Sequence, residues 1–226
     1  MSPVIPRPDP DPSRWTDPSA TYDRVAPYYA DRFLHELDAK PFDRDFLSRF
    51  AAAVGPRASE AAPVCDLGCG PGHLAGFLSE QGLPVIGIDL SAGMVEEARR
   101  RFPAVTFAQG DMTSLGRPDA SFSGLVCFYA LIHLPRSRVP LALGEMRRVL
   151  AGGAPLLLAV HGGSGSLHAS EMVDQPADLD ATLFSLPELT GLLEAAGFAL
   201  VEAHERAPYE QEAETQRLYA WAVRSD

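Results

Sequence analysis

The apolar positions of this chain of 226 residues alternate between short continuous runs and stripes at helical spacing. Short apolar runs bounded by turn residues are typical of strands buried on both faces of a parallel sheet. Five such runs lie at 64–67, 84–89, 105–108, within 123–135 and at 154–160. Apolar residues at every third or fourth position predict helices at about 41–54, after residue 73, after residue 91, at about 136–150 and at 186–196. With two more strands predicted at 198–205 and 217–223, the alternation favours an α/β fold.

The two ends of this pattern carry segments of a different character. Residues 1–19 contain six prolines, which exclude a helix or a central strand and favour a flexible tail. The alternative is a flap that Trp15 docks onto the domain. We expect one domain over 20–226, with a helical cover at 20–55 that is broken near Pro27. Residues 161–184 are predicted to form a long irregular segment that acts as a substrate lid.

Composition narrows the class of protein. The formal net charge is −11, which disfavours binding to a nucleic-acid backbone because such binding needs clustered Lys and Arg. The chain has neither an apolar run long enough for a membrane span nor an apolar signal core, so we expect a cytoplasmic protein that does not bind membranes. Its three cysteines fit no disulfide framework and no paired metal spacing. The oligomeric state is not readable.

The turn after the first predicted strand is the most informative stretch of the sequence. Asp66-Leu67-Gly68-Cys69-Gly70-Pro71-Gly72-His73 joins a strand to a helix, and its glycines let a ligand approach the backbone. The dinucleotide fingerprint needs a third glycine where His73 stands, and Asp66 would repel a pyrophosphate. A ligand with an ammonium group, a sulfonium and free ribose hydroxyls fits better, and this describes S-adenosylmethionine.

From Asp66 to Gly72 the sequence resembles the first motif of class I S-adenosylmethionine-dependent methyltransferases, in their small type 11/25 branch. The resemblance extends from about Tyr22 to the C-terminus. It implies a Rossmann-like three-layer sandwich with a seven-stranded, mostly parallel sheet in the order 3-2-1-4-5-7-6 and an antiparallel last strand. It also implies S-adenosylmethionine as cofactor, S-adenosylhomocysteine as product and a small molecule as methyl acceptor.

Candidate cofactor-binding residues follow from this motif and from the later strand ends. Asp89 lies 19 residues past Gly70, close to the spacing at which an acid meets a ribose, although it could instead cap the next helix. The stretch around Asp111 resembles the adenine loop of the family, with an Asx-turn as the alternative. The opening at Tyr22 resembles a "YDxxAxxY" segment whose hydroxyls bond the cofactor carboxylate, while the alternative is plain packing of the rings. The full set is Tyr22, Tyr29, Asp66, Gly68, Cys69, Gly70, Asp89, Leu90, Met94, Gly110, Asp111, Met112 and Phe128.

Methyl transfer is an in-line displacement, so positioning supplies most of the catalysis, and an acceptor hydroxyl or ammonium must also lose a proton. His133 follows the fourth strand and is the first candidate for the general base, although a similar "HxP" segment in relatives can simply start a helix. His161, at the end of the fifth strand, is the runner-up. A metal site can be drawn from His161, His168, Glu171 and Asp174, but no spacing is diagnostic and we expect none.

Two other functions remain open at this point. One is an NAD-dependent oxidoreductase on a similar sheet, against which His73 and Asp66 argue. The other is a protein that binds S-adenosylmethionine without turnover. Phe128-Tyr129-Ala130-Leu131 replaces the Asp/Asn-Pro-Pro-aromatic turn of methyltransferases that act on nucleic-acid bases. We therefore expect a small-molecule acceptor, with oxygen favoured over nitrogen.

Overall fold

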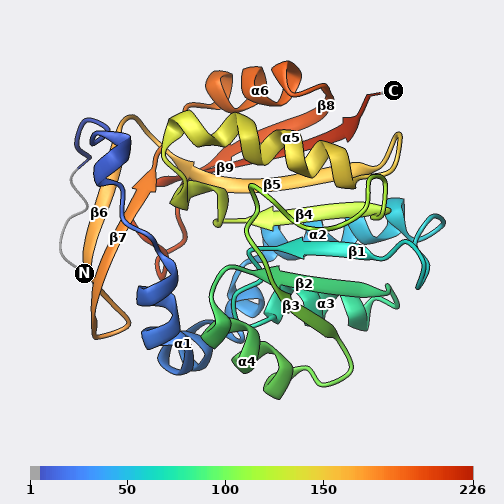
Figure 1. The fold of residues 1–226 in the computed structure, drawn as a ribbon, viewed down its shortest axis with the longest axis horizontal. Helices are drawn as coiled ribbons and strands as arrows, with labels where there is room; N and C mark the ends of the chain where they lie inside the picture. The colour runs from blue at the N-terminus through green and yellow to red at the C-terminus, as the bar shows by residue number, and fades with distance from the viewer. Residues whose placement is uncertain (1–5, 226) are drawn as a thin grey trace.

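The computed structural model describes residues 6–225, and its centre is a seven-stranded sheet (Figure 1). The strand order is β3-β2-β1-β4-β5-β9-β8, and β9 runs antiparallel to both of its neighbours. This confirms the predicted order, with β8 and β9 as its sixth and seventh strands. The strands are β1 (Val64–Leu67), β2 (Val85–Asp89), β3 (Thr106–Gln109), β4 (Gly124–Phe128), β5 (Pro155–Gly162), β8 (Phe198–Arg206) and β9 (Gln216–Arg224).

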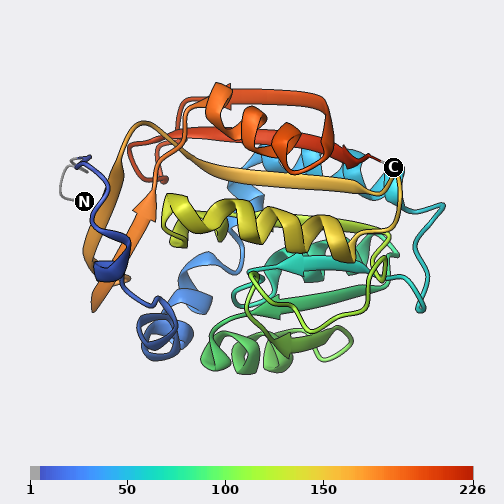
Figure 2. The same cartoon turned by 45° about the horizontal axis from the view of Figure 1, so that its top comes forward.

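Helices cover both faces of the sheet and complete the predicted three layers (Figures 1 and 2). One apolar core joins α5 and α6 to one face, and a second core joins α2, α3 and α4 to the other. The alternating side chains of β1 divide between them, since Cys65 and Leu67 belong to the first core and Val64 to the second. The helices are α1 (Ser19–Phe33), α2 (Pro41–Val54), α3 (His73–Glu80), α4 (Ala92–Arg101), α5 (Val139–Val149) and α6 (Leu186–Ala195).

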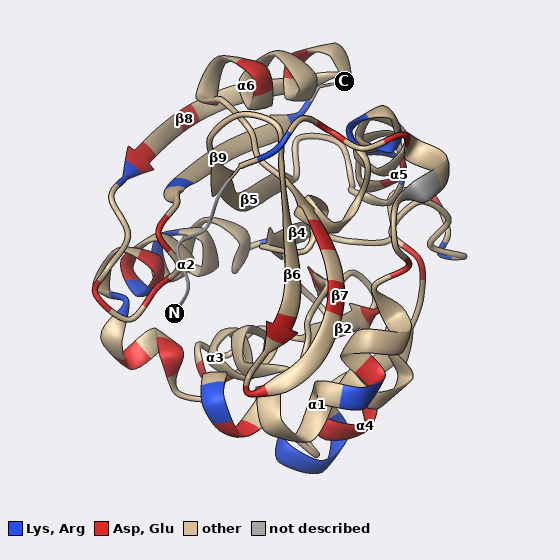
Figure 3. Ribbon diagram, turned by 90° about the vertical axis from the view of Figure 1, so that its left-hand side faces the viewer, with Lys and Arg blue, Asp and Glu red and all other residues tan. Residues whose placement is uncertain are grey.

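The segment between β5 and α6 differs from the predicted irregular lid. It forms an antiparallel hairpin of β6 (Ser166–Met172) and β7 (Gln175–Thr182), whose turn holds Val173 and Asp174 at positive φ. The hairpin stands in front of the carboxyl ends of the central strands, beside α1 (Figure 3). The strands were not predicted because only one face of the hairpin packs against the rest of the protein. Polar residues therefore interrupt every apolar run in its sequence.

The proline-rich segment was expected to be a flexible tail, but its described part lies against the hairpin (Figures 1 and 2). Arg7 exchanges both backbone hydrogen bonds with Ser166, at 2.9 and 2.8 Å, and its guanidinium pairs with the buried Asp180. The Trp15 indole donates to the His133 carbonyl at 2.9 Å. The docked flap is therefore the correct alternative for residues 6–18, and residues 1–5 lie outside the described part of the chain.

Helix α1 is continuous through Pro27, where a break was predicted. Packing against α4 holds it in place, because the Asp23 side chain accepts from Ser91 Oγ at 2.6 Å and from the Gly93 amide at 2.9 Å. A Cβ at Gly93 would lie 2.9 Å from the Asp23 carbonyl, so glycine is what allows this approach. These contacts offset the hydrogen bond that proline removes from a helix. None of the described helices has the length and apolar character of a membrane span.

Candidate functional site

The glycine turn between β1 and α3 forms as the sequence predicts. Gly68, Gly70 and Gly72 all have positive φ, at 73°, 52° and 86°. At Gly68 a Cβ would also lie only 2.0 Å from the Ala130 Cβ, so no other residue fits. At Gly70 the same atom would meet nothing within 4 Å, and Gly70 lines the cavity described next. The turn therefore leaves open space beside its backbone.

A cavity of about 380 Å³ lies at the carboxyl ends of β1, β2 and β4, within the range of small-molecule sites. Every candidate site residue except His161 lines it. Its other wall consists of the docked N-terminal segment, through Pro12, Trp15 and Thr16, and of α1. The cavity thus has one side built from the sheet edge and one side built from the N-terminal segment and α1.

Asp66 lines this cavity with a buried oxygen atom that has no hydrogen-bond partner among the described residues. The residue is 1% exposed, and the unpartnered atom is its Oδ2. Burial raises the pKa of Asp66 from 3.8 to about 7, and the nearby His73 opposes part of the rise. An unpartnered buried carboxylate is costly unless a ligand completes it, and a cationic donor such as an ammonium group would do so.

Asp89 ends β2 and is held in a fixed orientation. Its Oδ2 accepts from the Gly70 amide and its Oδ1 from the Ser91 amide, both at 2.8 Å. Helix α4 is capped by the Ser91 hydroxyl, which accepts from the Met94 amide at 3.1 Å. Burial raises the pKa of Asp89, although these amide bonds oppose it. The carboxylate is thereby aimed at the cavity edge while each oxygen keeps a further lone pair for a hydroxyl.

Asp111 adopts the Asx-turn that was considered as the alternative to an adenine contact. Its Oδ1 accepts from both the backbone amide and the hydroxyl of Thr113, at 2.8 Å each. Gly110 joins this loop to β2 because its amide donates to the Asp89 carbonyl at 2.8 Å. Gly110, Asp111 and Met112 all line the cavity, so the loop is placed beside Asp89 whatever the Asp111 side chain does. An adenine contact by Asp111 stays a prediction.

His133 and Tyr22 are brought together across the cavity. The Tyr22 hydroxyl lies 2.8 Å from His133 Nε2, and His133 Nδ1 lies 3.0 Å from the Asp180 carbonyl in β7. Because a carbonyl only accepts, Nδ1 carries the proton, and the Tyr22 hydroxyl donates to a neutral Nε2. Burial lowers the pKa of His133, which keeps this form at neutral pH. The hairpin therefore fixes the tautomer that a general base needs at Nε2.

His161 lies outside the cavity lining, which the sequence did not indicate. It packs beside Tyr129 with ring centroids 5.2 Å apart, and its Nδ1 lies 2.7 Å from the Thr215 hydroxyl. Burial, followed by the charge of Arg217, lowers the pKa of His161 to about 3. Neither its position nor its contacts suit a base for a ligand in the cavity, so the structure does not support that expectation.

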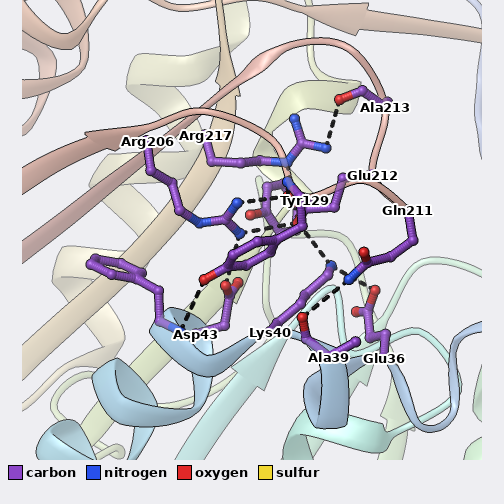
Figure 4. A network of polar contacts seen from close by, with 12 residues as sticks. Glu36, Ala39, Lys40, Asp43, Tyr129, Arg206, Gln211, Glu212, Ala213 and Arg217 are labelled. Carbon is purple, nitrogen blue, oxygen red and sulfur yellow. Dashed lines mark hydrogen bonds and ion pairs between the residues drawn. The ribbon is translucent and has the colours of Figure 1, made fainter.

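A buried network of charges behind the cavity was not foreseen from the sequence (Figure 4). Glu212 accepts from Arg206 at 2.6 Å and pairs with Lys40 at 3.4 Å and with Arg217 at 3.5 Å. Lys40 also donates to Glu36 at 2.7 Å. Lys40 and Arg217 each lie within 6 Å of the Tyr129 ring centre, and Tyr129 has a positive φ of 55°. The network holds this strained cavity residue, and no local pattern marks residues so distant in sequence as partners.

The residues present fit S-adenosylmethionine. The buried, unpartnered Asp66 suits its ammonium group, the fixed Asp89 carboxylate suits two ribose hydroxyls, and Met94, Met112 and Phe128 offer apolar surface for the adenine. The open side of Gly70 leaves room for the chain between ribose and amino acid. Dinucleotide pyrophosphates fit less well because two carboxylates stand at the turn.

Comparison with known proteins agrees with this geometry. A family model described as "Methyltransferase domain" matches residues 64–153. A demethylmenaquinone methyltransferase of Beutenbergia cavernae is 32% identical over 143 residues, which cover 63% of this chain and 57% of the relative. The chain spans about half the length of the curated relatives it matches.

Solved structures show the same fold across the whole chain. A 1,6-didemethyltoxoflavin-N1-methyltransferase of Burkholderia thailandensis, with 1,6-didemethyltoxoflavin and S-adenosylhomocysteine bound, gives a TM-score of 0.63 at 21% identity, covering 99% of this chain and 95% of that one. The cyclase SpnF gives 0.68 at 17% identity, covering 100% and 99%. The glycine motif, the sheet order and the family model agree: residues 64–153 of this chain match the methyltransferase-domain family, and the chain has the fold of S-adenosylmethionine-dependent methyltransferases.

Proposed function

We propose that this protein transfers a methyl group from S-adenosylmethionine to a small molecule, with an oxygen acceptor favoured over nitrogen. The observation that carries the proposal is the single cavity lining that joins Asp66, Asp89 and the adenine loop to His133. When bound, S-adenosylmethionine supplies an electrophilic methyl carbon on a positively charged sulfur. The contribution of the chain is to place donor and acceptor in line, which can supply roughly 7–11 kcal/mol.

In this proposal His133 removes the proton of an acceptor hydroxyl. Its Nε2 is the accepting nitrogen, and the bond from Nδ1 to the Asp180 carbonyl keeps the ring oriented. The Tyr22 hydroxyl, which donates to Nε2, marks the place that an acceptor hydroxyl would take. The docked segment around Trp15 lines this side of the cavity, where it would limit the access of water to the reacting atoms.

A small-molecule acceptor is supported by the shape and charge of the cavity. It is a cavity beneath the N-terminal segment and α1, and the hairpin of β6 and β7 carries acidic residues (Figure 3), of which Glu171, Asp174 and Asp178 are exposed. Such a face repels a phosphate backbone. The names of several relatives also point to small acceptors. The solved cyclase has the same fold under the name of a different reaction.

The test is transfer of a labelled methyl group from S-adenosylmethionine to a panel of phenols, carboxylic acids and amines. We expect at least one class to be methylated, with turnover lost in His133→Ala and kept in His161→Ala. Absence of S-adenosylhomocysteine binding by calorimetry would remove the basis of the proposal. Binding without transfer to any member of a broad panel would favour a non-catalytic role, and stronger stabilisation by NAD than by S-adenosylhomocysteine would favour an oxidoreductase.

A further inference from the structure

His73 has a feature that the proposed function leaves unexplained. It stands at the position where the dinucleotide fingerprint has its third glycine, at the first residue of α3, and its side chain is 10% exposed. Its Nε2 lies 2.8 Å from Glu36 Oε1. Its Nδ1 is buried and has no hydrogen-bond partner within residues 6–225, although His73 lines the cavity. A buried polar atom without a partner is costly and calls for a ligand group.

The partner on the other ring nitrogen fixes how His73 can act. Burial alone would raise the pKa of Glu36, but the hydrogen bond from His73 and the charges of His73 and Lys40 lower it to about 2. Glu36 is therefore ionised and only accepts, so Nε2 carries a proton. Nδ1 is then the ring nitrogen available to a ligand in the cavity, and it can donate a hydrogen bond only when it carries a proton as well. Lys40, itself held between Glu36 and Glu212, fixes Glu36 in place (Figure 4).

The position of His73 also complements that of Asp66. The two residues stand at opposite ends of the glycine turn, and both line the cavity with one unpartnered buried atom. Asp66 offers an acceptor for a cation, whereas a proton on His73 Nδ1, at the N-terminus of α3, would offer a donor for an anion. An ammonium and a carboxylate on one carbon atom would satisfy both. This is the chemistry of a free amino-acid end.

We infer that His73, oriented by Glu36 and Lys40, binds the α-carboxylate of the methyl donor and pairs with Asp66 to recognise its amino-acid end. This inference rests on the proposed function, because it concerns the same donor. It differs from the expected tyrosine contact, since the Tyr22 hydroxyl is hydrogen-bonded to His133. His73 is thus a binding residue, and Glu36 and Lys40 are positioning residues.

The test uses three ligands that differ only at this end. S-adenosylhomocysteine carries both charged groups, its decarboxylated analogue lacks the carboxylate, and 5′-methylthioadenosine lacks both. Calorimetry on the full chain measures each affinity for the wild type, His73→Ala and His73→Asn. We expect His73→Ala to weaken S-adenosylhomocysteine by roughly 10- to 100-fold, as for a charge-assisted hydrogen bond, and to leave the other two ligands within about 3-fold. His73→Asn returns an N–H donor near the Nδ1 position and should recover part of the loss.

Each outcome separates this inference from the function on which it rests. Unchanged 5′-methylthioadenosine affinity shows that the variants are folded, whatever the result with the longer ligand. An equal loss for all three ligands, or no loss for any, would overturn the role of His73 and leave the proposed donor in place. If the wild type binds none of the three ligands, the proposed function itself fails. Glu36→Gln should reproduce part of the His73→Ala loss for S-adenosylhomocysteine alone.

Discussion

Replacing Asp66 by Asn should make the ligand-free protein more stable and its donor site weaker. Burial raises the pKa of Asp66 from 3.8 to about 7, because the ionised carboxylate is held without a partner on Oδ2. A rise of this size corresponds to about 4 kcal/mol of destabilisation once the group is ionised, at about 1.4 kcal/mol per unit. Asparagine has nearly the same shape and does not titrate, so the variant escapes this cost.

The sign of the pH dependence follows from the raised pKa. Below pH 3.8 the carboxyl is protonated in the folded and unfolded states alike, and it costs nothing. As the pH rises through the interval up to about 7, the unfolded chain loses its proton first and the folded state loses relative stability. The gap in unfolding free energy between Asp66→Asn and the wild type should therefore widen by about 2 kcal/mol between about pH 5.5 and about pH 8.

Urea unfolding at these two pH values measures the gap, because other titrating groups cancel between variant and wild type. Asp45→Asn, at an exposed position of α2, is the matched control and should show no such widening. Calorimetry with S-adenosylhomocysteine should show a loss of roughly 10-fold or more for Asp66→Asn, since a bond to a charged group is removed. If the difference in unfolding free energy between variant and wild type stays constant across the pH range, or if the affinity for S-adenosylhomocysteine is unchanged, Asp66 is not an unpaired buried acid that binds the cationic end of the ligand.

Three further predictions address the base, the cover and the turn. His133→Ala should lower turnover by roughly 10²–10⁴-fold, whereas the control His161→Ala should change it by less than about 3-fold. Because burial lowers the pKa of His133, wild-type turnover should rise with pH through a pKa below 6.5 and then stay level. Equal losses of turnover in the two variants would contradict the assignment of His133 as the base. Asp180→Ala should speed proteolytic cleavage within residues 6–18, because the Asp180 carboxylate binds Arg7 and Thr16. Asp178→Ala, at an exposed side chain, is the control and should not change the rate of cleavage. An unchanged rate in Asp180→Ala would show that other contacts hold this segment. Gly68→Ala should destabilise the protein by about 3 kcal/mol or more in urea unfolding, because Gly68 has a φ of 73° and lies close to Ala130. Gly144→Ala within α5 is the control and should stabilise the protein by up to about 1 kcal/mol. Similar effects of the two changes would show that the backbone of the glycine turn is less restricted than described.

Much of the fold was readable because local signals agreed with one another. The glycine turn and the buried strands each have a local cause and form as predicted, and the capping box of Ser185 and Glu188 is the local cause of the start of α6. The family resemblance then supplied the strand order that local patterns cannot give. Thirteen candidate cofactor residues and His133 line one cavity. Most of them lie there because the carboxyl ends of parallel strands meet at one edge, whereas Tyr22 and Tyr29 are brought there by α1.

The packing of the N-terminal segment and the position of His161 could not be predicted, because contacts between residues distant in the sequence determine them. Arg7 pairs with a residue of β6 and with Asp180 in β7, and nothing in a proline-rich stretch indicates such partners. His161 follows a strand at the correct edge, yet the ring of Tyr129 and the charged network behind it occupy that part of the site. Glu36 gives no local signal at all, whereas the unusual His73 in place of a glycine was the one visible sign of its pair.

A crystal structure of the protein with S-adenosylhomocysteine bound tests the account most directly. We predict the amino-acid end between Asp66 and His73, the ribose hydroxyls on Asp89, the adenine beside Met112, and the sulfur facing the space next to His133. A ligand bound elsewhere on the chain, or one in this cavity with Asp66 and Asp89 both making no contact with it, would contradict the assignment of donor and site together.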